Sequence, residues 1–73
     1  MERINTRHFI FLDLTKEEYW ALSEEGDLSS ELTRSRRRTE LTGDGVRIVL
    51  KGRHGVLANK IARSLNDSGF NVE

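Results

Sequence analysis

The chain contains neither cysteine nor proline, and its apolar runs are short. Without cysteine, no disulfide and no thiolate metal site can hold the fold together, which fits a reducing compartment. The apolar run Phe9–Leu12 is far shorter than the roughly 20 residues that a membrane-spanning helix needs. The first residues, Met1–Asn5, lack the pattern of a signal peptide. We therefore expect a cytoplasmic protein that makes no contact with a membrane.

Residues that bind metals or carry out catalysis are also scarce. His8 and His54 are the only histidines, and neither belongs to an HxxxH or ExxH pattern, so a four-ligand zinc site lacks support. No serine stands in a GxSxG sequence. The adjacent carboxylates Glu17–Glu18 and Glu24–Glu25 point in different directions from a helix, which favours a solvated surface over an acid/base pair. We expect no metal, no cofactor and no enzymatic activity.

The length and composition limit the chain to one small domain that spans residues 1–73. A domain of this size buries only about 60% of the surface that its unfolded chain exposes. Apolar residues make up 36% of the sequence, which suffices for one thin core but not for a deep catalytic cavity as well. We expect a monomer that acts by binding a larger partner.

Charge is distributed unevenly along the chain, although the net charge is zero. Between Asp13 and Glu31 there are seven acidic residues and one basic residue, a net charge of −6. Between Arg34 and Arg63 there are nine basic and two acidic residues, a net charge of +7. This separation favours electrostatic steering toward a charged partner.

A strand is predicted at His8–Leu14, where phenylalanine, isoleucine and leucine dominate, as in a strand that is central in a sheet. Residues 1–6 are polar and are expected to fray.

Residues 27–36 allow two interpretations. Leu28 and Leu32 are four residues apart and are compatible with a helical turn, but a mobile loop is compatible as well. We therefore expect flexibility only in these two segments.

The first helix is predicted to begin after Thr15. This residue is a candidate N-cap, and Glu18 three residues later completes a capping box. Gly26 is a natural stop. The apolar stripe of the helix includes Tyr19 and Trp20, which predicts that both aromatic side chains are in the core or half-buried.

A hairpin and a second helix follow. Gly43–Gly45 supplies the turn between Arg37–Thr42, a polar edge strand, and Val46–Lys51. The second strand alternates between apolar and basic residues except at Val49. Val56–Asp67 has the apolar spacing of a helix with one buried face. Gly69 and Phe70 fit the Schellman motif that ends such a helix.

The final residues, Asn71–Glu73, are long enough for a short last strand. The resulting order is β-α-β-β-α, with or without that strand. It predicts a small α+β domain with an antiparallel sheet and two helices, for which the ferredoxin-like fold is one candidate.

Four arginines within five residues form the strongest candidate binding site, Arg34-Ser35-Arg36-Arg37-Arg38. A guanidinium group binds a carboxylate or a phosphate through two parallel hydrogen bonds. The same arginines are also compatible with a solubilising sheet edge, or with ion pairs to the acidic first helix of the protein itself.

A second basic segment, Lys51-Gly52-Arg53-His54-Gly55, precedes the last helix. Free backbone N–H groups at a helix start bind anions, and the alternative is an ordinary strand-to-helix turn. Trp20 becomes an anchor for a partner if its side chain is exposed, because tryptophan, tyrosine and arginine are enriched in binding hot spots. The candidate partner-binding residues are therefore Arg34, Arg36, Arg37, Arg38, Arg53, His54 and Trp20.

Two kinds of partner are compatible with these residues. A nucleic-acid binder would contact phosphates through the arginines, but the acidic first segment would be repelled by phosphate. Aromatic residues that could stack on bases are also absent from Arg34–Arg38, since the phenylalanines lie in the first strand and at Phe70. A protein surface that carries both signs of charge fits better.

The whole chain resembles small phage-encoded regulators of host bacterial RNA polymerase, of the transcription-inhibitor type found in Xanthomonas phages. The resemblance lies in the length, in the mixed α/β pattern without proline or cysteine, and in the arginine-rich segment Arg34–Arg38. It implies binding to the large subunits of host RNA polymerase in the host cytoplasm. It also implies inhibition of initiation through interference with the σ factor, together with antitermination.

Overall fold

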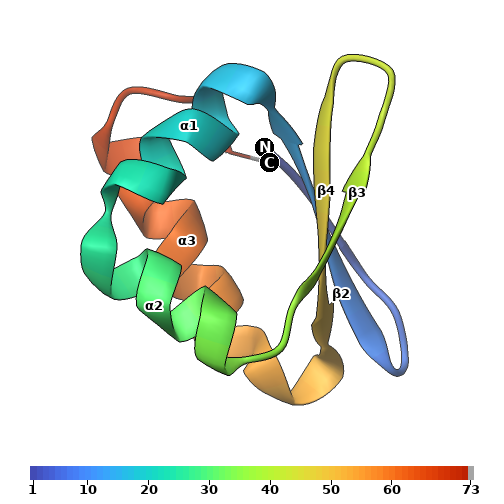
Figure 1. The fold of residues 1–73 in the computed structure, drawn as a ribbon. Coiled ribbons are helices and arrows are strands. Elements are labelled where there is room, and N and C mark those ends of the chain that lie inside the picture. The colour runs from blue at the N-terminus through green and yellow to red at the C-terminus, as the bar shows by residue number, and fades with distance from the viewer. Residues whose placement is uncertain (73) are drawn as a thin grey trace.

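Four antiparallel strands form one sheet in the computed structural model, which describes residues 1–72. The strands are β1 (Glu2–Asn5), β2 (Phe9–Thr15), β3 (Arg38–Leu41) and β4 (Gly45–Lys51). They lie side by side in the order β1-β2-β4-β3, so that β2 and β4 are central (Figure 1).

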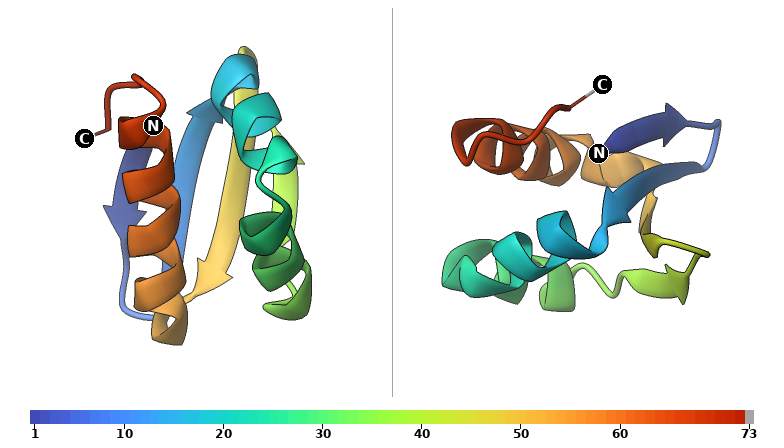
Figure 2. Two further views of the ribbon diagram at one scale, coloured as in Figure 1. Left: turned by 90° about the vertical axis from the view of Figure 1, so that its left-hand side faces the viewer. Right: turned by 90° about the horizontal axis from the view of Figure 1, so that it is seen from above.

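The helices are all placed on one face of this sheet (Figure 2). They are α1 (Lys16–Glu24), α2 (Gly26–Arg34) and α3 (Gly55–Asp67), and a 3-10 turn, η1 (Gly52–His54), links β4 to α3. The domain therefore has two layers, and no helix of residues 1–72 covers the second face of the sheet.

The core lies between the two layers and follows from the alternation of side chains along the central strands. Ile10, Leu12 and Leu14 of β2 are buried on the helix side, and so are Ile48 and Leu50 of β4. The helices contribute Leu22, Leu32, Leu57, Ala58, Ile61 and Leu65 to the same cluster. This is the thin single core that the composition predicts.

Both predicted helix signals are confirmed. The Thr15 hydroxyl accepts a hydrogen bond from the backbone N–H of Glu18, and the Glu18 carboxylate accepts one from the backbone N–H of Thr15. At the end of α3, the N–H groups of Gly69 and Phe70 donate to the carbonyls of Asn66 and Leu65, and Gly69 has a φ of 90°. This is the Schellman motif.

The α+β class and the order strand, helix, hairpin, helix are also confirmed. The sequence analysis missed β1, because its residues are polar and show no apolar run. In the structure β1 pairs with β2, Met1 is buried, and the Arg3 guanidinium donates to the Asn59 side chain of α3 at 2.5 Å. Residues 1–6 thus contain an ordered edge strand instead of a frayed end.

For two further segments the structure decides between alternatives that the sequence left open. Gly26–Arg34 forms the helix α2, because Leu32 is buried and Leu28 packs against the core. Asn71 and Val72 form no strand, and Glu73 lies outside the described residues. The edge of β2 is already occupied by β1, so the sheet gains its fourth strand from the start of the chain and not from its end.

The prediction that Trp20 is in the core or half-buried is wrong, since its side chain is 70% exposed. The inward face of α1 carries Glu18 and Leu22, both of which are buried. Trp20 is two residues from each of them, which is a rotation of about 200° around the axis of a helix with 3.6 residues per turn. Trp20 is therefore on the opposite side of α1 from these two buried residues. Tyr19 is half-buried, as predicted.

None of the helices within residues 1–72 combines the length and the apolar character needed to cross a bilayer.

Candidate partner-binding site

The structure brings together the two basic segments that the sequence separates. Arg34 is in the last turn of α2, Arg53 is in η1, and His54 is the N-cap residue of α3. The end of α2 and η1 lie next to each other at the bottom of the molecule in Figure 1. Both segments therefore contribute to one surface.

This surface is a shallow pocket with a volume of about 410 Å³. We call it the basic pocket, and its lining is Glu31, Arg34, Ser35, Arg53, His54, Val56, Leu57 and Lys60. Its charged side chains are three cations and one carboxylate. Because these come from α2, η1 and α3, the pocket exists only in the folded chain.

The arginines of the basic pocket have no acidic partner in the described part of the chain. Glu31 accepts a hydrogen bond from the Lys60 ammonium group at 3.1 Å, and this pair is partly exposed. None of the ion pairs within residues 1–72 includes Arg34 or Arg53, whose side chains are exposed. Pairing of these arginines with the acidic helix α1, which was one alternative, is therefore not found.

His54 adds a polar group to the same pocket. Its Nε2 atom is buried and has no hydrogen-bond partner among residues 1–72. Its side chain makes no cap for α3, so the first N–H groups of that helix have no side-chain acceptor there. A carboxylate in this pocket would meet two guanidinium groups near a helix start, both of which favour an anion.

The other three arginines of the cluster, Arg36, Arg37 and Arg38, are not among the residues that line the basic pocket. Arg36 lies in the connector after α2 with a φ of 57°, an uncommon conformation for a residue with a side chain. The Nε atom of Arg37 is buried without a hydrogen-bond partner in the described residues. Arg38 begins β3 and lies 3.8 Å from Glu40 in an exposed ion pair. Only Arg34 of the predicted cluster lines the basic pocket.

Trp20 is exposed, as an anchor would be, but it is not part of the basic pocket. Lys60 and Glu31 are part of it and were not identified from the sequence. Their positions in two different helices carry no signal of proximity, because only the packing of α2 against α3 brings them within 3.1 Å.

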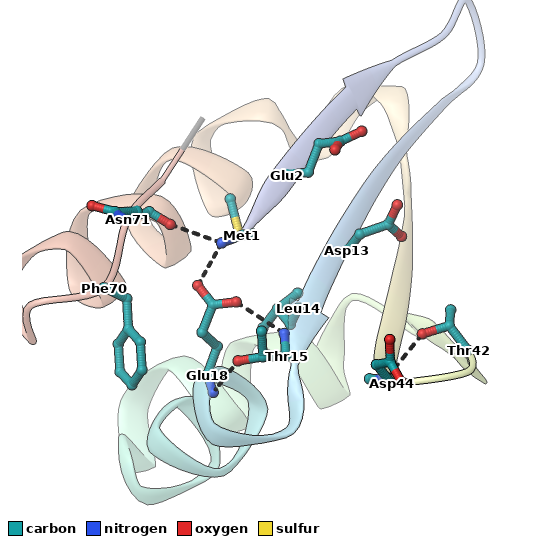
Figure 3. A pocket seen from close by; sticks show the side chains of 11 residues that line it. Met1, Glu2, Asp13, Leu14, Thr15, Glu18, Thr42, Asp44, Phe70 and Asn71 are labelled. Carbon is teal, nitrogen blue, oxygen red and sulfur yellow. Dashed lines mark hydrogen bonds and ion pairs between the residues drawn. The ribbon is translucent and has the colours of Figure 1, made fainter.

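A second pocket, of about 480 Å³, has the opposite charge. Figure 3 shows this acidic pocket, whose lining includes Glu2, Asp13, Glu18 and Asp44 and in which the Glu18 carboxylate faces the N-terminal amino group of Met1. The Met1 ammonium group donates to the Glu18 carboxylate at 2.5 Å and to the Asn71 carbonyl at 2.8 Å. This ion pair is almost completely buried.

The pKa values of two carboxyl groups in the acidic pocket reflect these bonds. Burial raises the pKa of Glu18, but hydrogen bonds from the ammonium group and from Thr15 outweigh burial and hold it below its ordinary value. Arg47 binds both oxygens of Asp13, at 2.6 and 3.0 Å, and these hydrogen bonds lower the pKa of Asp13. Both carboxylates thus have a partner within the protein, Glu18 in a buried pair and Asp13 in a partly exposed one.

Metal binding finds no support in this geometry. Within residues 1–72, no group of three or more histidine, aspartate or glutamate side chains is arranged to hold a metal ion.

Comparisons of the chain with protein-family models, with curated proteins and with solved structures give no match. The basic pocket is therefore defined by the residues and the geometry of this chain alone.

Proposed function

We propose that this protein is a binding module without catalytic activity, and that its basic pocket captures an acidic segment of a larger protein. The observation that carries the proposal is the convergence of Arg34 and Arg53 in one pocket without acidic partners in residues 1–72. Two exposed guanidinium groups in one pocket repel each other, and an added carboxylate reduces that repulsion while accepting paired hydrogen bonds.

A protein segment suits the basic pocket better than a nucleic-acid backbone does. Glu31 lies inside the pocket, where it would repel a continuous row of phosphates. The exposed acidic residues of α1 and of the α1–α2 junction add to that repulsion. A protein surface can place its carboxylates against the arginines and its cations against Glu31 and α1.

We further propose that the partner is host bacterial RNA polymerase, bound through its large subunits in the host cytoplasm. This part of the proposal rests on the resemblance in length, composition and arginine content to small phage-encoded regulators. Binding would then interfere with the σ factor and block initiation. Antitermination is a second activity that the resemblance to these regulators implies. An acidic surface on the polymerase is the chemistry that the basic pocket requires.

The test uses protein with an affinity tag at its C-terminal end, purified bacterial core RNA polymerase and purified σ factor. We expect the immobilised protein to retain the core enzyme before and after nuclease treatment, and to reduce the formation of holoenzyme when it is added before σ. Retention that disappears with nuclease would contradict a protein contact. Absence of any retention would exclude the polymerase, while capture of another acidic protein through Arg34 and Arg53 would leave the binding mode intact.

A further inference from the structure

The second face of the sheet is not covered by any helix of residues 1–72 (Figure 2), and it carries large apolar side chains. Phe9 of β2 is 44% exposed and Ile4 of β1 is 37% exposed. Phe11, which lies between them on the same face, is half-buried. We call this surface the open sheet face.

The strand register places cations on the same face of the sheet as the two phenylalanines. Residues that are directly opposite in neighbouring strands lie on the same face of the sheet. Phe9 is opposite Lys51, and Phe11 is opposite Val49, which is itself opposite Arg38. Arg38 and Lys51 are both exposed. The fold thus assembles aromatic and basic side chains that are far apart in the sequence.

The two rings differ in what covers them. The centroids of Phe9 and Phe11 are 6.3 Å apart, and their planes differ by 36°. The guanidinium carbon of Arg47 lies 5.1 Å from the centroid of the Phe11 ring, a cation–π contact. Phe9 has no such cover, and its exposed ring is free to receive a flat ligand.

The acidic residues of the open sheet face lie in a different row from the phenylalanines. One row of residues crosses the four strands and consists, in order, of Glu2, Asp13, Arg47 and Glu40. Arg47 binds Asp13 through two hydrogen bonds. The register places no carboxylate of residues 1–72 opposite Phe9 or Lys51. The carboxylate nearest to Phe11 along its strand, Asp13, is bound to Arg47.

We propose that the open sheet face binds single-stranded nucleic acid, with a base stacked on the exposed ring of Phe9 and phosphates beside Lys51 and Arg38. Aromatic side chains on the central strands of a four-stranded sheet stack on unpaired bases, and nearby cations bind the backbone. A duplex would bind poorly, because its bases are stacked on each other and present no free face to the rings. This surface is separate from the basic pocket, and its occupancy does not depend on a protein partner.

Charge and chemistry favour this occupant over a second copy of the chain. A symmetric contact of two copies centred on Phe9 would bring Lys51 of one copy close to Lys51 of the other. A polyanion with aromatic faces complements both the cations and the rings. In the sequence, no aromatic residue lies among the arginines. The pairing of β2 with β4 brings Phe9 next to Lys51, and the pairing of β4 with β3 adds Arg38 to the same face.

The test measures the fluorescence anisotropy of a labelled oligothymidylate of about ten nucleotides, a length within the site sizes of single-strand binders. We expect binding by the wild-type chain, weaker binding of a duplex of the same length, and a decrease in affinity of about tenfold for Phe9→Ala. Phe9→Tyr keeps a ring for stacking and should bind like the wild type. Trp20→Ala removes an exposed aromatic side chain from the helix layer and should have no effect.

Amide NMR spectra locate the oligonucleotide independently of the variants. We expect shift changes at β2 and β4, around Phe9, Phe11 and Lys51. No binding by the folded wild-type chain would overturn the proposal, and so would equal affinities of Phe9→Ala and wild type. Binding that is lost in an Arg34→Ser/Arg53→Ser variant but kept in Phe9→Ala would assign the nucleic acid to the basic pocket and would also overturn it. Dimerisation that disappears in Phe9→Ala would show that a second copy occupies this face.

Discussion

The acidic pocket and the basic pocket lie at opposite ends of the molecule and use their charges differently. In the acidic pocket, Glu18 holds the buried N-terminal ammonium group and Asp13 holds Arg47. In the basic pocket, Arg34 and Arg53 are exposed and are not part of any ion pair within residues 1–72. Charges that are paired inside the protein stabilise the fold, whereas charges without an internal partner are available to a ligand.

This difference separates stability from binding. Removal of one member of a buried ion pair leaves the other member unpaired in a dry environment and is strongly destabilising. An exposed charge without a partner contributes little to stability, and its removal even reduces repulsion between like charges. Substitutions in the acidic pocket should therefore unfold the protein before they alter binding, and substitutions in the basic pocket should do the reverse.

The largest expected effect on stability is that of Glu18→Gln. Glutamine keeps the shape of the side chain but leaves the buried ammonium group of Met1 without its counter-charge. We expect the free energy of unfolding to fall by about 3 kcal/mol, measured by urea denaturation of a protein whose first residue is Met1. The matched control is Glu17→Gln in the same turn, which is exposed and should change stability by at most about 0.5 kcal/mol. Equal stability of the two variants would contradict a structural role for the pair.

A smaller effect on stability is expected from acid below about pH 4. The pKa values of Asp13 and Glu18 are lower in the folded chain than their ordinary values. Such groups contribute stability that is present above the ordinary carboxyl pKa and is lost as the pH falls through the folded value. The free energy of unfolding should therefore be nearly constant down to about pH 5 and decrease below about pH 4.

The control for the acid effect is Asp13→Asn/Glu18→Gln, which lacks both titrating groups. Its stability at neutral pH is lower, but it should decrease less between about pH 5 and pH 3 than that of the wild type. Urea denaturation at each pH gives the comparison. Parallel pH curves for the two proteins would show that other carboxyl groups cause the acid sensitivity.

Local signals in the sequence predicted much of the fold, because they act over a few residues. The capping box of Thr15 and Glu18, the hairpin around Gly43–Gly45 and the Schellman motif at Gly69 are all present in the structure. The strand β1 was missed because its order depends on a remote contact, the insertion of the Met1 ammonium group between Glu18 and Asn71. No local pattern encodes such a contact.

The candidate site was predictable in part for the same reason. The sequence identified Arg34, Arg53 and His54 as basic or anion-binding residues, but not that they share a pocket with Lys60. It also treated Trp20 as part of the apolar stripe, although the polar residue Glu18 takes the buried position on α1. A carboxylate on an inward helix face carries no sequence signal until its buried counter-charge is known.

The most direct test of this division of roles uses the double variant Arg34→Ser/Arg53→Ser. Its free energy of unfolding and its affinity for core RNA polymerase are measured on the same sample. The matched control is Lys16→Ser/Arg63→Ser, which removes two exposed cations that lie outside the basic pocket. We expect both variants to unfold within about 0.5 kcal/mol of the wild type. We expect only Arg34→Ser/Arg53→Ser to lose affinity, by about tenfold or more. Equal affinities of the two variants, or a large loss of stability confined to Arg34→Ser/Arg53→Ser, would contradict the assignment of binding to the basic pocket.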